Sequence, residues 1–263
     1  MGRRKCILIT GAEGIIGSAV RRYLADRYEI RSLTLRRETF TDYAADIADL
    51  NAIIPAFEGI DAVIHLAAET SFTASWEEIH RSNLLGTYNI YEAARRMKVE
   101  TVVFASSNHT IGMYEIEAVP DIYALDDPRV YNHEVEVRPD SLYAVSKVYG
   151  EALGRYYMEC HSMRVFCLRI GSVRDDDDPC APSISESVPW HPRLAELPVE
   201  KRYQRMRATW LSQRDCAELI ACCLEADQTR WAIVYGISNN PRQFWDLSYV
   251  RQVLGYNPQD SAP

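Results

Sequence analysis

The sequence predicts an α/β protein built on a doubly wound parallel sheet, and two observations lead to this fold class. Short apolar segments alternate with longer amphipathic ones, at the spacing of right-handed βαβ units whose sheet is covered on both faces. The first apolar segment, residues 5–10, also runs directly into a glycine-rich turn at residues 11–17, which opens an amphipathic segment. Because this order is typical of Rossmann-type folds, we expect such a fold with a small C-terminal substrate-binding portion.

The predicted elements follow one another in order along the chain. Apolar runs predict strands over residues 5–10, 28–35, 62–66, 101–105, 164–170 and 232–235. Helical periodicity predicts helices over residues 11–26, 46–57, 76–97, 141–160 and 215–224. We therefore expect a single domain over residues 1–263, with a dinucleotide-binding core over about 1–172 and a substrate-side portion over about 173–263.

Two polar, proline-bearing stretches, residues 111–138 and 173–207, interrupt the alternation. Material inserted after the C-terminal ends of parallel strands lies over the ligand crevice, so we expect both stretches to form walls of the substrate site. The second stretch contains four consecutive aspartates at 175–178. We interpret this run as a solvated loop tip and expect no metal there, because four adjacent carboxylates do not all converge on one ion.

The composition narrows the classes of partner. The formal net charge of −8 argues against nucleic acid or an anionic membrane surface as a general partner. The seven cysteines form neither a C-x-x-C pair nor a zinc-type spacing, which favours reduced thiols. Because the chain also contains no apolar run of signal-peptide or membrane-spanning length, we expect a cytoplasmic protein without a membrane partner.

The turn at residues 11–17 predicts a dinucleotide site. Gly11, Gly14 and Gly17 are spaced as the fold requires, for a tight turn, for close approach of the backbone to a pyrophosphate, and for tight packing of helix on strand. Ile15 and Ile16 would begin the helix whose N-terminus faces the phosphates. The expected cofactor is therefore NAD or NADP.

The end of the second predicted strand favours NADP. NAD-binding proteins usually place a carboxylate there, but this chain has Thr34 followed by Arg36 and Arg37. A hydroxyl and two guanidinium groups can bind a 2′-phosphate that a carboxylate would repel. The alternative is that both arginines are solvated and that Glu38 contacts the ribose. Asp46 either binds the adenine amino group or simply caps a helix.

Tyr143 and Lys147 form the predicted catalytic pair. They lie four residues apart on a predicted helix, and therefore on one face of it. A neighbouring ammonium stabilises the phenolate, which lowers the pKa of a group that is otherwise a poor base. Ser107, at the end of the fourth predicted strand, can hydrogen-bond the reacting oxygen while Tyr143 takes its proton.

Over nearly its whole length, the chain resembles the extended short-chain dehydrogenase/reductase superfamily. The resemblance lies in residues 10–17, in Asn83-Leu84-Leu85-Gly86-Thr87, and in the Tyr143–Lys147 pair. Within the superfamily, uronate dehydrogenases resemble the chain at residues 104–112, 138–143, 169–172 and 208–212. The C-terminal tail resembles uronate dehydrogenases and archaeal-type sugar dehydrogenases equally. The long segment between Ser172 and Ala208 and the arginines after Thr34 depart from the uronate dehydrogenase pattern.

The resemblance implies roles for further residues. On the substrate side, it implies contacts with the sugar for Thr70, Ser107, Asn108, His109, Tyr143, Ser172 and Arg205. On the cofactor side, it implies contacts for Ile47, Leu66, Ala67, Ala68, Asn83, Tyr143, Lys147 and Ile170. His109 could instead be structural, and Arg205 could belong to an exposed face of a helix with Lys201, Arg202 and Arg207.

The resemblance implies that the function is NAD(P)-dependent oxidation of the C1 hydroxyl of a pyranose to the lactone, with Tyr143 as the base. The substrate would be a uronate, an aldose or an aldose phosphate, because one arginine serves carboxylate and phosphate alike. A nucleotide-sugar epimerase or dehydratase is the main alternative, and a non-catalytic dinucleotide sensor is a lesser one. Members of the superfamily often dimerise, so a homodimer is a further expectation.

Overall fold

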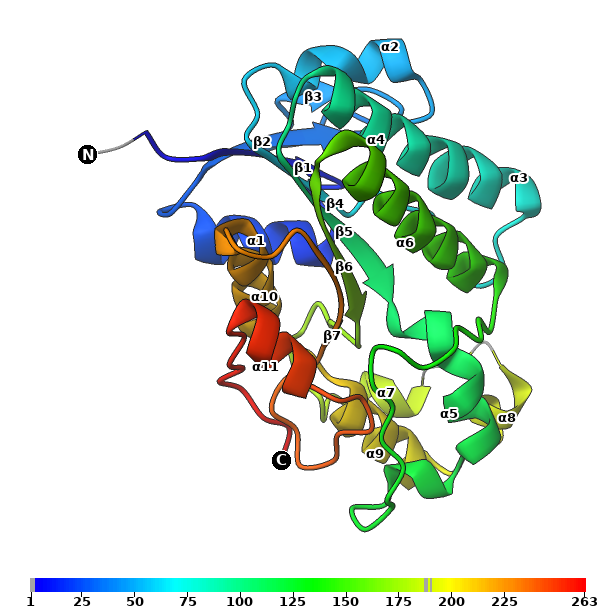
Figure 1. Ribbon diagram of the computed structural model, residues 1–263. Coiled ribbons are helices and arrows are strands. Elements are labelled where there is room, and N and C mark those ends of the chain that lie inside the picture. The colour runs from blue at the N-terminus through cyan, green and yellow to red at the C-terminus, as the bar shows by residue number, and fades with distance from the viewer. Residues whose placement is uncertain (1–2, 187–188, 190) are drawn as a thin grey trace.

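The computed structural model describes residues 3–186, 189 and 191–263. Its centre is a seven-stranded sheet whose paired strands all run parallel, in the order β3-β2-β1-β4-β5-β6-β7 (Figure 1). The strands are β1 (Cys6–Thr10), β2 (Glu29–Thr34), β3 (Tyr43–Ala44), β4 (Ala62–His65), β5 (Thr101–Ser107), β6 (Arg164–Ile170) and β7 (Trp231–Gly236). The predicted fold class is confirmed, and β3 was missed because a two-residue strand has no readable periodicity.

The order of the strands places the ligand crevice. From β1 the chain adds β2 and β3 on one side, and then crosses back to add β4 to β7 on the other side. The crevice opens where the direction reverses, over the C-terminal ends of β1 and β4. Apolar side chains cover both faces of the sheet, since Ile7 and Ile9 belong to one core cluster and Leu8 to the other.

Helices cover each face of the sheet (Figure 1). One face carries α2 (Leu50–Ile53), the 3-10 turn η1 (Ile54–Phe57), α4 (Gly86–Arg96) and α6 (Leu142–His161). The other carries α1 (Ile15–Leu24), α10 (Gln213–Glu225) and α11 (Ser248–Leu254). Within the described residues, no helix is long and apolar enough to cross a membrane.

The single helix predicted over 76–97 is divided into three parts, namely α3 (Trp76–Glu78), the π-helix η2 (Ile79–Leu85) and α4. The widened turn brings Asn83 into the protein, where it is buried. π-helical turns inside helices occur frequently at functional sites, and they leave no mark in the apolar periodicity.

The two inserted stretches contain helices that the sequence did not predict. The first forms η3 (Asn108–Ile111), α5 (Gly112–Ala118) and η4 (Asp121–Tyr123), and the second forms α7 (Ser183–Glu186), α8 (Pro192–Ala195) and α9 (Val199–Thr209). Figure 1 shows α5, α7, α8 and α9 gathered beyond the C-terminal end of β5. These helices were missed because they are short or polar, so no apolar stripe identifies them.

Candidate active site

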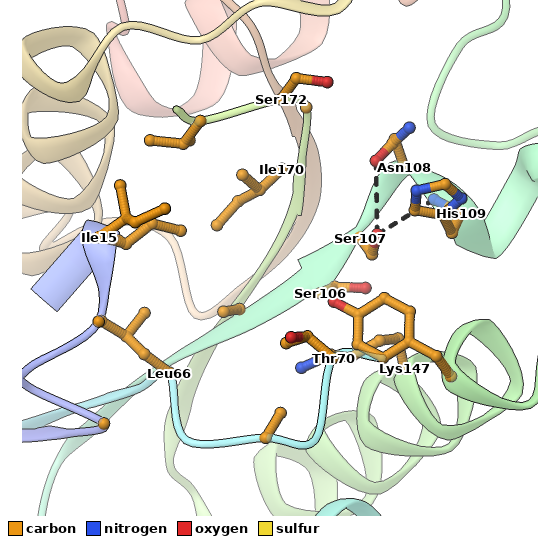
Figure 2. A pocket seen from close by; sticks show the side chains of 18 of the residues that line it. Ile15, Leu66, Thr70, Ser106, Ser107, Asn108, His109, Lys147, Ile170 and Ser172 are labelled. Carbon is orange, nitrogen blue, oxygen red and sulfur yellow. Dashed lines mark hydrogen bonds between the residues drawn. The ribbon is translucent and has the colours of Figure 1, made fainter. Parts of the chain in front are cut away.

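The main cavity has a volume of about 780 Å³ and lies over the C-terminal ends of β1, β4, β5 and β6. Most of the predicted site residues meet there (Figure 2). Those that line it are Gly11, Gly14, Ile15, Ile16, Gly17, Leu66, Ala67, Ala68, Thr70, Ser107, Asn108, His109, Tyr143, Lys147, Ile170, Ser172 and Arg205. Among the described residues, no group of three or more His, Cys, Asp and Glu side chains could hold a metal ion.

The glycine turn fits a dinucleotide. Gly11 has a φ of +69°, and a Cβ added there would lie 2.8 Å from the backbone nitrogen of Ala67. A Cβ on Gly17 would lie 2.6 Å from the carbonyl oxygen of Ala12, so this glycine lets α1 pack closely on the turn. Helix α1 begins at Ile15 with no side-chain cap and no acidic residue in its first turn. Its N-terminal N–H groups therefore point to a site suited to phosphate.

A second cavity of about 410 Å³ adjoins the first, because Gly11, Gly14, Ala67 and Ala68 line both. The predicted adenosine-side residues that line it are Thr34, Arg36, Asp46 and Ile47, and Glu38 lines it as well. The Thr34 hydroxyl donates to the carbonyl of Arg36 at 2.7 Å, which shapes the turn after β2. Arg37 is exposed and lines neither cavity, so its predicted place in the site is not supported.

Asp46 does not cap the following helix. That helix, α2, is capped by Asp49, whose side chain accepts from the amide of Ala52. The Asp46 carboxylate accepts from the amide of Ala48 at 2.8 Å and pairs with Arg81 at 2.6 Å, on the wall of the second cavity. These contacts, outweighing a partial burial, hold the pKa of Asp46 below its ordinary value.

Ser107 and Tyr143 line the same cavity from two different elements. Ser107 ends β5, and Tyr143 lies in the first turn of α6, whose N-cap Ser141 accepts from the amide of Ala144. Burial raises the pKa of Tyr143 to about 12, and the neighbouring Ser107 hydroxyl partly offsets this rise. In the cofactor-free protein, Tyr143 is therefore a neutral phenol at neutral pH.

Lys147 lies one helical turn after Tyr143, with its Nζ 5.4 Å from the centre of the tyrosine ring. Its burial lowers its pKa to about 8. Nearby, burial and the charge of Lys147 lower the pKa of His65 to about 3, so this ring is neutral. His65 hydrogen-bonds Thr10 at 2.8 Å and Thr87 at 3.1 Å. Lys147 thus faces Tyr143 without a competing charge from this histidine.

The predicted sugar-binding side chains line the same cavity, and Asn108 and His109 lie just beyond Ser107 (Figure 2). His109 Nδ1 lies 2.7 Å from a carboxylate oxygen of Asp140, and Phe72 packs edge-on against the rings of His109 and Tyr143. The Ser172 hydroxyl is 2.9 Å from that of Thr209. Phe72 and Asp140 were not predicted; Asp140 adjoins the start of the catalytic helix, a signal that could have been used.

Arg205 lines the cavity, so it does not belong to an exposed helix face. Its Nε donates to Glu115 Oε1 at 2.8 Å, and the Tyr123 hydroxyl donates to the same oxygen at 2.7 Å. Glu115 is buried on α5, so the first inserted stretch supports the cavity from behind.

The two inserted stretches differ in their relation to the cavity. Residues 111–138 do not line it, which corrects the prediction that they form a wall. The second stretch does line it, through Val173, Arg174, Arg205 and Met206.

Asn83 lines neither cavity, which corrects its predicted contact with the cofactor. Its side-chain amide donates to the Ser146 hydroxyl and to the carbonyl of Glu69, each at 2.9 Å. It also accepts from the amide of Glu69 at 2.7 Å. Asn83 therefore ties the loop after β4 to the catalytic helix α6, and its role is to position both.

A buried ion pair, which no sequence motif predicted, holds α6 against the sheet. Arg169 of β6 donates to both carboxylate oxygens of Glu151 at 2.9 Å, and Ser106 donates to one of them at 2.6 Å. Since Glu151 follows Lys147 by one turn and Ser106 precedes Ser107, the network fixes both catalytic elements relative to each other.

With this geometry in view, comparison with known proteins assigns the family. The model of the NAD-dependent epimerase/dehydratase family matches residues 7–174. The chain belongs to this family. It is an oxidoreductase. The glycine turn lies within the matched residues, and so do all the residues that line the main cavity except Arg205 and Met206.

The relatives include several dehydrogenases. The chain is 38% identical to the NAD-dependent glucose-6-phosphate dehydrogenase of Haloferax volcanii, over 97% of this chain and 94% of that one. It is 36% identical to the L-arabinose 1-dehydrogenase (NAD(P)(+)) of the same organism, over 97% of each. The solved uronate dehydrogenase of Agrobacterium tumefaciens superposes with a TM-score of 0.78 at 31% identity, covering 98% of this chain and 86% of its own.

Proposed function

We propose that the protein is an NAD(P)-dependent sugar dehydrogenase that oxidises the C1 hemiacetal hydroxyl of a pyranose to the lactone. The observation that carries the proposal is the group of Ser107, Tyr143 and Lys147 in one cavity, between the glycine turn and a wall of polar side chains. The names of the relatives, which act on glucose 6-phosphate, arabinose and uronates, support sugar as the substrate class.

In this proposal, Ser107 and Tyr143 hold the C1 oxygen, and Tyr143 accepts its proton. The Lys147 ammonium stabilises the resulting phenolate and so lowers the tyrosine pKa from the value of about 12 that burial sets. The oxidised cofactor, when bound along the glycine turn, supplies the acceptor for the hydride that leaves C1. Asn108, His109, Ser172 and Arg205 orient the ring, so the reacting carbon is held in position.

A panel of substrates tests the function. Uronates, aldose 6-phosphates and neutral aldoses are each offered with NAD and with NADP, and formation of reduced cofactor is followed. We expect turnover with at least one sugar and release of its lactone. If every sugar fails while the protein binds reduced cofactor, the proposal is wrong.

The epimerase or dehydratase activity of the wider family is the second candidate, and the matched family model is the observation that favours it. Such enzymes keep their cofactor through the catalytic cycle. If the purified protein carries tightly bound dinucleotide and converts a nucleotide sugar with no added NAD or NADP, the second candidate is correct and the dehydrogenase proposal is not. The non-catalytic alternative has less support, because Tyr143 and Lys147 are both present and face the cavity.

The preference for NADP over NAD is also a proposal. It is supported by Thr34 in place of a carboxylate and by Arg36 on the wall of the adenosine-side cavity, while Glu38 on the same wall opposes it. Changing Arg36 to alanine should lower kcat/KM for NADP about tenfold and leave that for NAD within about twofold, because only NADP carries the 2′-phosphate. Arg37→Ala, at an exposed position outside both cavities, is the matched control. A wild-type enzyme that strongly prefers NAD would contradict the proposal.

The homodimer stays a proposal as well. Exposed apolar side chains on adjoining helices support it, namely Tyr88 of α4 and Val145 and Tyr156 of α6. The division into a cofactor core and a substrate-side portion and the cytoplasmic location are proposals too.

A further inference from the structure

Three lysine or arginine side chains line the main cavity, and two of them already have a place in the account. Lys147 faces Tyr143, and Arg205 is paired with Glu115 on the substrate side. The third, Arg174, follows β6 in the second inserted stretch, and neither the sequence motifs nor the proposed mechanism uses it.

The backbone of Arg174 is anchored to α10 and, through it, to α1. The side-chain amide of Gln213, at the start of α10, donates to the carbonyl of Arg174 at 2.9 Å and to that of Asp175 at 3.1 Å. The backbone amide of Gln213 donates to Asp177 Oδ1 at 2.9 Å. Arg22 of α1 donates to Gln213 Oε1 at 3.4 Å. The loop is thus tied to the helix whose N-terminus faces the expected phosphates.

Arg174 and that N-terminus line the same cavity. Gly14, Ile15 and Ile16 line it from α1, and Val173 and Arg174 line it from the segment after β6. Figure 2 shows Ile15 of α1 and Ser172 of that segment facing the same space. The carboxylate beside the turn, Glu13, is already paired with Arg21 at 3.2 Å.

The negative charge of the expected pyrophosphate exceeds what the N-terminus of α1 can balance, so a further cation is needed beside it. A pyrophosphate carries about two negative charges, whereas a helix N-terminus supplies only about half a positive charge. Guanidinium groups bind phosphate oxygens through two parallel N–H donors.

The present partner of the Arg174 side chain is one that a phosphate can replace. Its Nε and Nη2 donate to Asp176 at 2.8 and 2.6 Å, and Nη2 also donates to the Ser183 hydroxyl at 2.7 Å. The Asp176 side chain is 42% exposed, so water can solvate it when the arginine leaves. An exposed ion pair of this kind contributes little stability, so exchanging it for a phosphate costs little.

We propose that Arg174 binds the pyrophosphate of the dinucleotide from the side opposite α1, exchanging Asp176 for phosphate oxygens. This inference rests on the cofactor binding contained in the proposed function. It assigns to the second inserted stretch a role in holding the cofactor in addition to its role in the substrate wall.

Isothermal titration calorimetry of the whole protein with NADH, NADPH and ADP-ribose tests the inference. Arg174→Ala should raise the dissociation constants of all three ligands by a similar factor, about 10- to 100-fold, because all three carry the pyrophosphate. Arg174→Lys should recover part of the loss, since it restores the charge without the two parallel donors. Arg214→Ala is the matched control, because this exposed α10 arginine pairs with Asp260 outside the cavity.

A second variant separates phosphate binding from a structural role. Asp176→Asn removes the competing carboxylate and should tighten NADH binding about two- to fivefold. If Asp176→Asn weakens binding as much as Arg174→Ala does, the pair acts only as a structural unit and the inference is overturned. It is also overturned if Arg174→Ala binds NADH like the wild type, whether or not the KM for the sugar changes. A wild-type protein that binds none of the three ligands refutes the proposed function together with this inference.

Discussion

Replacing Tyr143 with phenylalanine is expected to lower kcat about 10³-fold while changing the dissociation constant of NADH by less than about threefold. The phenylalanine keeps the ring, which packs against Phe72, and removes only the hydroxyl in the cavity that Ser107 also lines. The proton of the C1 hydroxyl then has no acceptor, while the glycine turn and its cofactor contacts are unchanged. Sugar-dependent reduction of the cofactor measures the first quantity, and fluorescence titration measures the second.

Tyr149→Phe is the matched control for this prediction. Tyr149 lies on the same helix, is partly buried and does not line the cavity, so its loss of a hydroxyl should leave kcat within about twofold. A Tyr143→Phe enzyme that keeps about a tenth or more of wild-type kcat would contradict the assignment of this residue as the base.

Replacing Lys147 with methionine should abolish most activity and yet stabilise the cofactor-free protein. The loss of the ammonium removes the group that favours the phenolate, so we expect kcat to fall at least about 10²-fold. The gain in stability arises because burial lowers the lysine pKa to about 8 in the folded protein from its ordinary value of 10.5. A shift of that size corresponds to roughly 3 kcal/mol of unfavourable burial, which methionine avoids.

The pH dependence of the free energy of unfolding tests this cause. Below pH 8 the lysine is charged in both states, so the wild type bears the full cost of burying it. Between pH 8 and 10.5 the folded protein releases the proton before the unfolded chain does, and the wild type becomes more stable as pH rises. Urea unfolding should therefore show the largest gain for Lys147→Met at neutral pH and a smaller gain at about pH 9.5. A variant less stable than wild type at neutral pH, or a gain that is independent of pH, would contradict the prediction.

The sequence predicted the sheet well because its strands are buried on both faces and therefore appear as continuous apolar runs. All seven residues of β5 are buried, for example, and the predicted segment lies within that strand. The inserted helices were not predictable in the same way. Helix α9 carries mostly polar residues, and it owes its place to contacts such as that of Arg205 with Glu115, 90 positions apart in the chain.

The site residues also divide into those set by local geometry, which the sequence predicts, and those set by tertiary contacts, which it does not. Gly11, Tyr143 and Lys147 could be placed from spacing alone, because a local turn and one helical turn set their geometry. The side chains that support them could not be, since Asn83 reaches Ser146 and Glu151 reaches Arg169 only after the elements pack. Such pairs depend on tertiary structure, and no local pattern reports them.

The central claim is that hydrogen leaves C1 of a sugar as hydride. The most direct measurement uses a substrate from the panel that carries deuterium at C1 only, with mass spectrometry of both products. The account predicts one deuterium in the reduced nicotinamide and a lactone that has lost its label. A reduced cofactor without deuterium, or a product that keeps deuterium at C1, would contradict it.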